Sequence, residues 1–271
     1  MRLAHSINTP TWASKKEGRN ATMYLQKTYR AGKTIEIQKM AIRKHPRGAR
    51  KKRHGPTTEA MAAYNKKLAE RELTRIIAEN FGPGDMSIVM TYRKAGRPTA
   101  DQAKRDREKI LRKLRDYFRH RGEELRYVAV TAYGERGAIH HHMVISGIDY
   151  RDLQAMWPHG RVIVSPLDDT GNYWRLAHYY IDQLRTSPAT GEEIKGKRWS
   201  CSKNLRRPPP KTEVKEARTW RDEPKPLNGY YIDKDSIENG ICPLTGEPYQ
   251  FYRMVRISPE SRRKERVRRN Q

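Results

Sequence analysis

The sequence has few of the residues that define several common protein classes. Its only two cysteines, Cys201 and Cys242, lie far apart, which excludes a disulfide scaffold and a Cys-x-x-Cys zinc site. The longest apolar-leaning run, from Ala138 to Ile148, is far shorter than the roughly 20 residues that a membrane helix needs. The N-terminus shows no signal-peptide core. We therefore expect a cytoplasmic protein without a membrane partner.

Acidic residues are scarce relative to basic ones. The 271-residue chain has 57 Lys and Arg against 31 Asp and Glu, which gives a net charge of +26. Such an excess predicts a polyanionic partner, most often nucleic acid. We expect DNA contacts from a basic segment that is broken by proline and glycine. The basic residues of this segment are Arg43, Lys44, Arg47, Arg50, Lys51, Lys52 and Arg53.

A nucleotide-binding motif is also missing. The segment Gly191 to Lys197 approaches a P-loop, but Arg198 stands where Ser or Thr is required, and no apolar strand precedes it. We therefore expect no ATPase and no small-molecule cofactor. Any helicase would have to come from the host.

Composition divides the chain into three regions. Residues 1–57 carry little periodicity and are predicted to form a basic, flexible N-terminal arm. Residues 58–186 carry regular helix and strand patterns. Residues 187–271 are predicted to be a C-terminal extension with a basic tail. Aromatic and basic residues in this extension would either stack single-stranded bases or form a small packed hairpin. They are Tyr230, Tyr231, Tyr249, Phe251, Tyr252 and Arg253.

The middle region predicts an α+β fold. A first helix over residues 58–80 is followed by elements in the order β-α-β-β-α-β-α. This order favours an antiparallel sheet with helices on one face, of ferredoxin-like or RRM-like type. The strands are predicted at 86–92, 127–133, 138–146 and 160–165, and the helices after Thr99, at 149–157 and at 172–184.

Three consecutive histidines lie inside an apolar strand. Because side chains alternate along a strand, His140 and His142 share one face and His141 lies on the other. Two imidazoles on one rigid face can bind a divalent cation, which then acts as a Lewis acid on a phosphate oxygen. The alternative is a histidine-rich buried strand without a ligand.

Two tyrosines follow on the last predicted helix. Tyr179 falls on the polar side of the helix with Arg175, while Tyr180 lies nearer the apolar stripe. A tyrosine oxygen is a competent nucleophile toward phosphorus when a metal neutralises the phosphate. Tyr179 is therefore the predicted nucleophile and Tyr180 the less favoured alternative, and Arg175 is a predicted DNA contact. Without the histidines, two packing tyrosines would be the better interpretation.

With these residues, the sequence resembles the HUH endonucleases, most of all the replication initiators of rolling-circle plasmids, phages and integrative elements in Gram-positive bacteria. The resemblance spans residues 60–185. It implies an HUH nuclease core in which His140, His142 and a further polar residue hold Mg²⁺ or Mn²⁺. It also implies that a helix tyrosine attacks DNA and keeps the 5′-phosphate. The motifs are Val89 to Tyr92, Gly137 to His142 and Leu176 to Tyr179.

The sequence departs from the family pattern in three places. His141 replaces the usual aliphatic residue between the histidines. The preceding strand lacks a carboxylate, which leaves Glu135, in the turn, as the nearest candidate for a third metal ligand. Asp182 occupies the position where a lysine often follows the tyrosine. Tyr180 directly follows Tyr179, whereas a second nucleophile would lie one helical turn away, so we expect a single-tyrosine enzyme.

The resemblance implies a sequence-specific single-strand DNA endonuclease and strand-transferase that initiates rolling-circle replication through a 5′-phosphotyrosine. Its substrate would be single-stranded or hairpin origin DNA, and its partners a host helicase and polymerase. A transposase or relaxase of a mobile element would use the same chemistry. A non-enzymatic RNA- or DNA-binding protein with a ferredoxin-like sheet is the alternative of another class, and it would carry aromatic residues on its central strands.

Overall fold

The described part of the chain divides into two units, and neither is continuous in sequence. The computed structural model describes residues 23–42, 58–217 and 219–257. Within the described residues, the terminal unit comprises residues 23–30, 35–42, 58–64, 209–217 and 219–257, and the central unit comprises Ala31–Thr34 and Asn65–Pro208. Within the described ranges, no helix is both long and apolar enough to cross a membrane.

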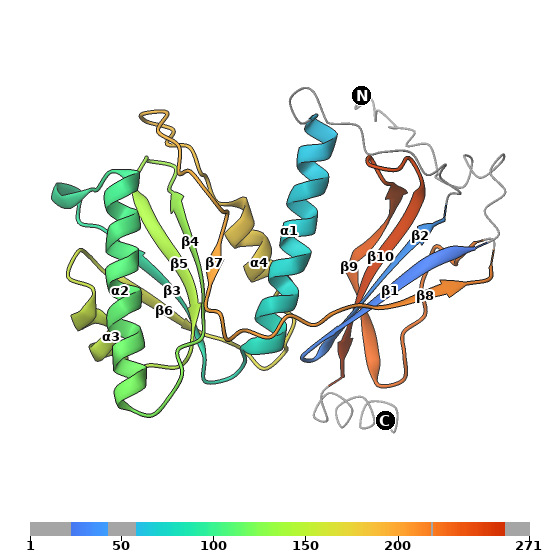
Figure 1. Cartoon of the computed structure of the whole chain (residues 1–271), viewed down its shortest axis with the longest axis horizontal. Coiled ribbons are helices and arrows are strands. Elements are labelled where there is room, and N and C mark those ends of the chain that lie inside the picture. Colours follow the sequence, from blue (N-terminus) through green and yellow to red (C-terminus); the bar gives the residue numbers. More distant parts are fainter. Residues whose placement is uncertain (1–22, 43–57, 218, 258–271) are drawn as a thin grey trace, which may run out of the picture. The chain divides into compact units, whose positions relative to one another are not determined.

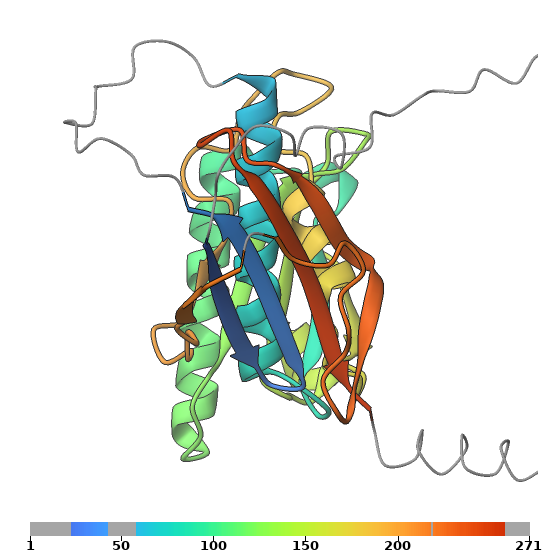
Figure 2. The ribbon, with the colours of Figure 1, turned by 90° about the vertical axis from the view of Figure 1, so that its right-hand side faces the viewer.

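A five-stranded sheet forms the terminal unit, with the strand order β8-β1-β2-β10-β9 (Figures 1 and 2). Strands from both ends of the chain therefore share one sheet. A buried ion pair joins β2 to β10, since the Arg253 Nη2 atom donates to Glu36 Oε1 at 2.8 Å. The strands are β1 (Tyr24–Ala31), β2 (Thr34–Ala41), β8 (Lys211–Lys215), β9 (Tyr230–Ile241) and β10 (Pro248–Arg256).

The sheet corrects the prediction of a flexible arm over residues 1–57, because β1 and β2 lie inside that range. The alternation in β2 is short, from Ile35 to Gln38, and the strand buries Glu36 as well as Ile35, because distant Arg253 pairs with the Glu36 carboxylate. The predicted DNA contacts between Arg43 and Arg53 lie outside the described residues and stay predictions.

The C-terminal aromatic residues form a packed hairpin, one of the two alternatives predicted for them. Strands β9 and β10 pair antiparallel, with a register shift between Phe251 and Arg253. Tyr249, Phe251 and Tyr252 are all buried. These three rings are therefore part of the core of the terminal unit and are not available to stack on bases.

The central unit contains the predicted ferredoxin-like arrangement. Its elements β3-α2-β4-β5-α3-β6 form an antiparallel sheet in the order β6-β3-β5-β4, and β7 is added at the β4 edge. The strands are β3 (Met86–Thr91), β4 (Tyr127–Tyr133), β5 (Ile139–Ile145), β6 (Val162–Pro166) and β7 (Ser200–Cys201). The helices are α1 (Glu59–Asn80), α2 (Ala100–His120), α3 (Tyr150–Met156) and α4 (Trp174–Asp182), and a short 3-10 helix covers Lys94–Gly96.

Helices cover both faces of this sheet, whereas the sequence predicts them on one. Helices α2 and α3 pack on Ile88, Met143 and Ile145. Helices α1 and α4 pack on the opposite face, on Val130 and Val144. The continuous apolar run of β4, in which every residue is buried, fits a strand that is covered on both sides. The predicted α+β class and the antiparallel sheet are confirmed, and the unit continues beyond residue 186 to Pro208.

Candidate active site on the histidine strand

Strand β5 presents its histidines as the alternation predicts. The rings of His140 and His142 lie together, with centroids 4.6 Å apart, on the face that α1 and α4 cover. His141 is fully buried on the opposite face, and its ring lies edge-on to the ring of Trp157. The pairing of His142 with Val89 on β3 and Val130 on β4 fixes this register from both sides. The strand therefore holds two imidazoles at one place without any loop.

A glutamine supplies a third donor atom to this pair. The Oε1 atom of Gln183 lies 3.2 Å from Nε2 of His142 and 3.4 Å from Nε2 of His140. The amide has one orientation because its Nε2 group donates to the Tyr179 carbonyl at 3.0 Å. Two imidazole nitrogens and one carboxamide oxygen thus converge at the end of α4. The sequence analysis missed Gln183, although it lies one helical turn after Tyr179.

The chain fixes Gln183 by ending α4 immediately before it. Gln183 has extended backbone angles, and the next residue, Leu184, forms a bridge with Tyr133 at the end of β4. The Tyr133 N–H donates to the Leu184 carbonyl at 2.9 Å. Because β4 neighbours the histidine strand, this bridge brings the end of the tyrosine helix over His140 and His142.

The two rings suit a metal ion in their protonation and hydrogen bonding. Burial and the neighbouring His140 lower the pKa of His142 to about 4, so His142 is neutral at neutral pH, as a ligand must be. Its Nδ1 atom, which carries the proton when Nε2 binds a metal, is buried without a hydrogen-bond partner in the described part of the chain, so the hydrogen-bonding support comes from His140. His140 Nδ1 lies 3.3 Å from the Ala138 carbonyl, and a proton on that nitrogen leaves the lone pair on Nε2. The donor set therefore fits a divalent cation.

The predicted third ligand, Glu135, does not join the pair. It lies exposed in the turn between β4 and β5, with no contact to either ring. Among the described residues, no three His, Cys, Asp or Glu side chains form a group that could hold a metal ion. The prediction follows sequence proximity, but the turn projects beyond the sheet. The oxygen donor comes instead from Gln183, more than forty residues later.

The two tyrosines pack as the helical wheel predicts. Tyr180 is 2% exposed, and its hydroxyl lies 2.9 Å from Ser87 Oγ on β3. Burial raises its pKa, which keeps the hydroxyl protonated. Tyr179 is 49% exposed, and its ring lies against the His142 ring with centroids 5.0 Å apart. Of the two hydroxyls, that of Tyr179 is the one that an incoming phosphate can reach beside the histidines.

Two charged residues, Arg175 and Asp182, lie on the exposed face of α4, and each contacts another side chain. Arg175 is exposed one turn before Tyr179, with its guanidinium 5.9 Å from the Trp174 ring centroid. Asp182 pairs with Lys66 of α1, and that hydrogen bond holds the pKa of Asp182 below its usual value. Lys66 of α1 therefore lies beside Asp182, at the position where the family often has a lysine in the helix itself.

A buried polar network lies behind the site, on the far face of β5. His141 Nδ1 lies 2.9 Å from Thr131 Oγ1, and His141 Nε2 lies 3.0 Å from the Tyr92 hydroxyl. Arg107 donates to Thr131 Oγ1 at 2.7 Å, and the Tyr92 hydroxyl donates to Asp106 at 3.4 Å. Burial lowers the pKa of His141 to about 3, so this ring is neutral. His141 therefore links β3, β4 and α2 and does not reach the candidate site.

Comparison with known proteins agrees with the fold and the site. Residues 85–183 match the model of a family described as replication-associated protein, of the ORF2 type. The matched segment runs from the start of β3 to Gln183, and it includes both histidines and Tyr179. Over this segment, the predicted resemblance to a Rep-type replication initiator is confirmed. No curated protein and no solved structure matches the chain.

Proposed function

We propose that the chain is a metal-dependent, sequence-specific DNA nickase and strand-transferase that initiates rolling-circle replication. One observation carries the proposal. Gln183 Oε1 lies within 3.4 Å of the Nε2 atoms of both His140 and His142, and the exposed Tyr179 ring packs on His142. The match of residues 85–183 to replication-associated proteins supports the replication role.

His140, His142 and Gln183 are the residues that would hold Mg²⁺ or Mn²⁺. The bound cation supplies Lewis-acid stabilisation of the negative charge that develops on the scissile phosphate. Imidazole donors favour Mn²⁺ over Mg²⁺, which prefers oxygen ligands, so Mn²⁺ is the better probe. Gln183 also ties the site to the nucleophile, because the same amide bonds the Tyr179 carbonyl.

The chemical step exchanges one phosphodiester for another, so the number of ester bonds to phosphorus is unchanged. The Tyr179 oxygen bonds to phosphorus as the bond from phosphorus to the 3′ oxygen breaks, which leaves a 5′-phosphotyrosine and a 3′-hydroxyl. The phenolic proton passes to solvent, and the departing 3′ oxygen takes a proton from solvent. Attack of a 3′-hydroxyl on the phosphotyrosine reverses the step, so strand closure needs no ATP. Arg175 is exposed one turn before Tyr179 and would contact a neighbouring phosphate.

The structure argues against the non-enzymatic alternative. A ferredoxin-like sheet that binds RNA stacks bases on aromatic residues of an open sheet face. Here α1 and α4 cover one face of the sheet, and α2 and α3 cover the other. The exposed side chains beside this part of β5 are the partly exposed His140 and the Tyr179 ring, which are suited to phosphoryl transfer.

The test is covalent trapping. The full chain is incubated with Mn²⁺ and a labelled hairpin oligonucleotide drawn from a library, and SDS-resistant adducts are collected. Tyr179→Phe should form no adduct while still binding DNA, since only the oxygen is removed. Tyr180→Phe is the matched control and should retain adduct formation. Mass spectrometry of the trapped peptide should locate the DNA on Tyr179.

Three outcomes would contradict the proposal. An adduct on Tyr180 would reassign the nucleophile. An adduct that forms equally well with the metal chelated would remove the role of the histidine site. Tight DNA binding without any adduct, across the library and with either metal, would favour the non-enzymatic alternative.

A further inference from the structure

The edge strand β7 of the central sheet is flanked by two hollows. A cavity of about 720 Å³ is lined partly by α2 and by residues 122–127, and a second, of about 670 Å³, is lined partly by residues 197–203. Cys201, Ser202 and Lys203 line both cavities, so the two are neighbours on either side of one short strand. Open depressions of this size can each accept a single nucleotide of a flexible strand.

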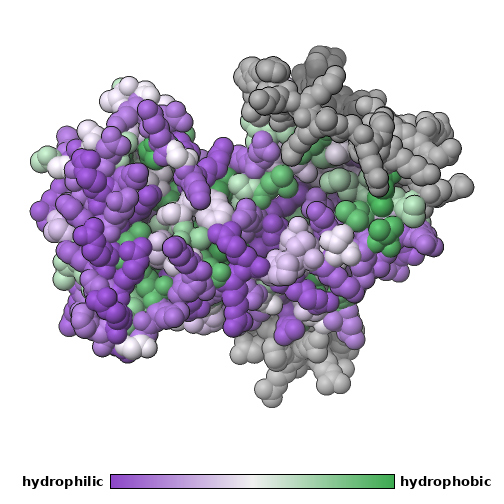
Figure 3. Space-filling model, in the orientation of Figure 1, coloured by the Kyte–Doolittle hydropathy of each residue, from purple (hydrophilic) through white to green (hydrophobic). Residues whose placement is uncertain are grey.

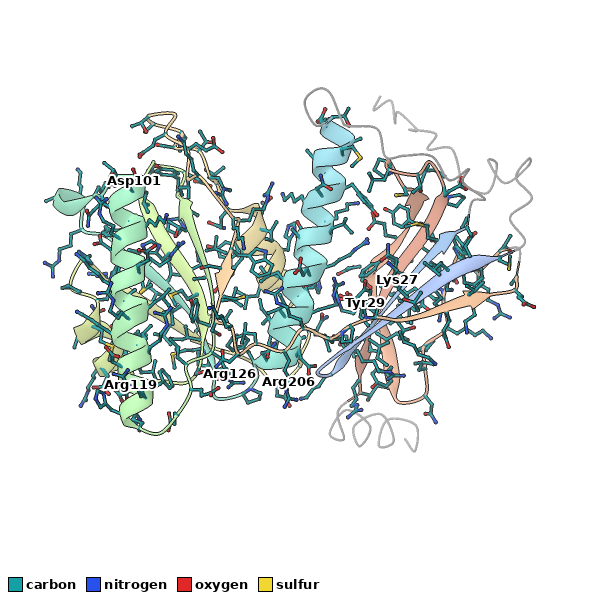
Figure 4. The ribbon with its side chains drawn as sticks, viewed as in Figure 1. Lys27, Tyr29, Asp101, Arg119, Arg126 and Arg206 are labelled. Atoms are coloured by element: carbon teal, nitrogen blue, oxygen red, sulfur yellow. The ribbon has the colours of Figure 1, made fainter. Side chains whose placement is uncertain are left out.

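Among the charged side chains that line these cavities, six are basic and three are acidic. The basic ones are Arg115, Arg119, Lys197, Arg198, Lys203 and Arg207. Figure 4 shows Arg119 projecting from α2, and Figure 3 shows that the surface over α2 is mostly hydrophilic.

The carboxylates beside these cavities already have partners. Glu72 accepts from Arg207 at 2.9 Å, and Glu124 accepts from the Asn204 amide at 3.0 Å. Lys197, Arg198 and Lys203 are exposed, and none of the three has a carboxylate partner in the described part of the chain. Three cations without an ion-pair partner in a concave part of the surface favour the binding of phosphates.

The position of β7 connects this surface to the candidate site. Strand β7 pairs with β4 at Val128 and Ala129, and β4 pairs with β5 so that Val130 faces His142. Two strand spacings, roughly 10 Å, therefore separate β7 from the histidine strand. A DNA strand whose scissile phosphate lies at His142 reaches this surface within a few nucleotides.

We propose that the two cavities flanking β7 form a binding surface for single-stranded DNA, here named the β7 surface. It holds the phosphates of the substrate strand beyond the cleavage site, with Arg198 and Lys203 as its principal contacts. The inference rests on the proposed function only in taking that strand to be the nuclease substrate. It is therefore tested by binding, with the metal chelated and no cleavage possible.

The first test compares two double variants of the full chain. Arg198→Gln with Lys203→Gln should weaken binding of a 30-nucleotide single strand about tenfold, measured by fluorescence anisotropy. The log–log salt slope should fall in size by about 1.4, or 0.7 per phosphate contact. The control, Lys109→Gln with Arg151→Gln, removes two exposed cations from α2 and α3 and should change affinity less than twofold. Equal losses in both variants, or no loss in the first, overturn the proposal.

The second test uses a thiol that the chain already carries. Cys201 lines both cavities and is partly exposed, while Cys242 is 1% exposed and serves as the internal reference. Saturating single-stranded DNA should slow alkylation of Cys201 several-fold, as read by peptide mass spectrometry. An unchanged Cys201 rate overturns the proposal. Protection by a duplex that matches or exceeds protection by the single strand overturns the single-strand assignment. Neither result depends on adduct formation, so failure of the nuclease proposal would be seen separately.

Discussion

The two faces of β5 both carry histidine, but the rings on the two faces have different surroundings. On one face, His140 and His142 meet Gln183 and the Tyr179 ring, and of these the His140 ring is partly exposed and the Tyr179 ring half-exposed, while His142 is buried. On the other, His141 has no exposed surface, and both of its ring nitrogens have hydrogen-bond partners in the protein. Residue type alone therefore does not define a ligand. The partners that the fold places opposite each ring decide whether it binds a cation or holds the core.

The largest effect is expected on the site face. His140→Ala or His142→Ala should lower the rate of adduct formation at least about 10³-fold, because several kcal/mol of charge stabilisation depend on the cation that these rings would hold. Gel quantification of adduct over time provides the measurement. His120→Ala, at an exposed position in the last turn of α2, is the control. Full activity in His140→Ala, whose ring is only partly buried, would contradict the site.

A substitution on the opposite face of β5 should instead lower the stability of the fold. His141→Ala removes two hydrogen bonds and leaves a cavity, which should lower the free energy of unfolding by about 3 kcal/mol. Urea denaturation at 25 °C measures the change. Protein that remains folded at lower temperature should still form adduct. If adduct formation disappears while the unfolding free energy is unchanged, the division between the two faces fails.

Gln183 provides a sharper test of which oxygen completes the site. Gln183→Ala should weaken Mn²⁺ binding about 10- to 100-fold, as measured by calorimetric titration of the full chain. Gln183→Glu restores an oxygen donor and should bind Mn²⁺ at least as tightly as the native chain. Glu135→Ala should leave the affinity unchanged. The reverse pattern, with Glu135→Ala weakening the metal and Gln183→Ala neutral, would return the third ligand to the turn.

The smallest effect concerns the loop that follows the tyrosine helix. Glu192 accepts from the Tyr133 hydroxyl at 2.8 Å and from the Ala100 N–H at 3.0 Å, and these bonds lower its pKa. A carboxylate with a lowered pKa stabilises the fold above its unfolded-state pKa, and that contribution is lost as the pH falls through the folded-state pKa. At pH 7, the melting temperature of Glu192→Gln, measured by thermal denaturation, should therefore be slightly lower than that of the native chain. The difference should disappear in acid, and a difference that grows on acidification would contradict it.

The predictions that succeeded rest on local periodicity. The alternation of β5 separates His141 from its neighbours, and the contacts of the three rings on opposite faces confirm it. The helical wheel of α4 separates Tyr180 from Tyr179, and the burial of Tyr180 alone confirms it. The prediction of Glu135 as a third ligand rests on proximity in sequence, and it failed. Glu135 is near the histidines along the chain, but the turn points it to solvent, while Gln183 is distant in sequence and adjacent in space. Gln183 lies on the polar side of the helix predicted over 172–184, but only the fold shows that its amide meets the two histidines.

The sequence by itself determined the order of the elements in the central unit, the shared face of His140 and His142, and the exposure of Tyr179. Each of these follows from a repeat of two or 3.6 residues and needs no distant partner. Only the tertiary structure decided that β1 and β2 form a sheet with C-terminal strands, that Lys66 reaches Asp182, and that Gln183 completes the histidine pair. These contacts join residues that are distant in sequence, and burial and pairing across the fold select them.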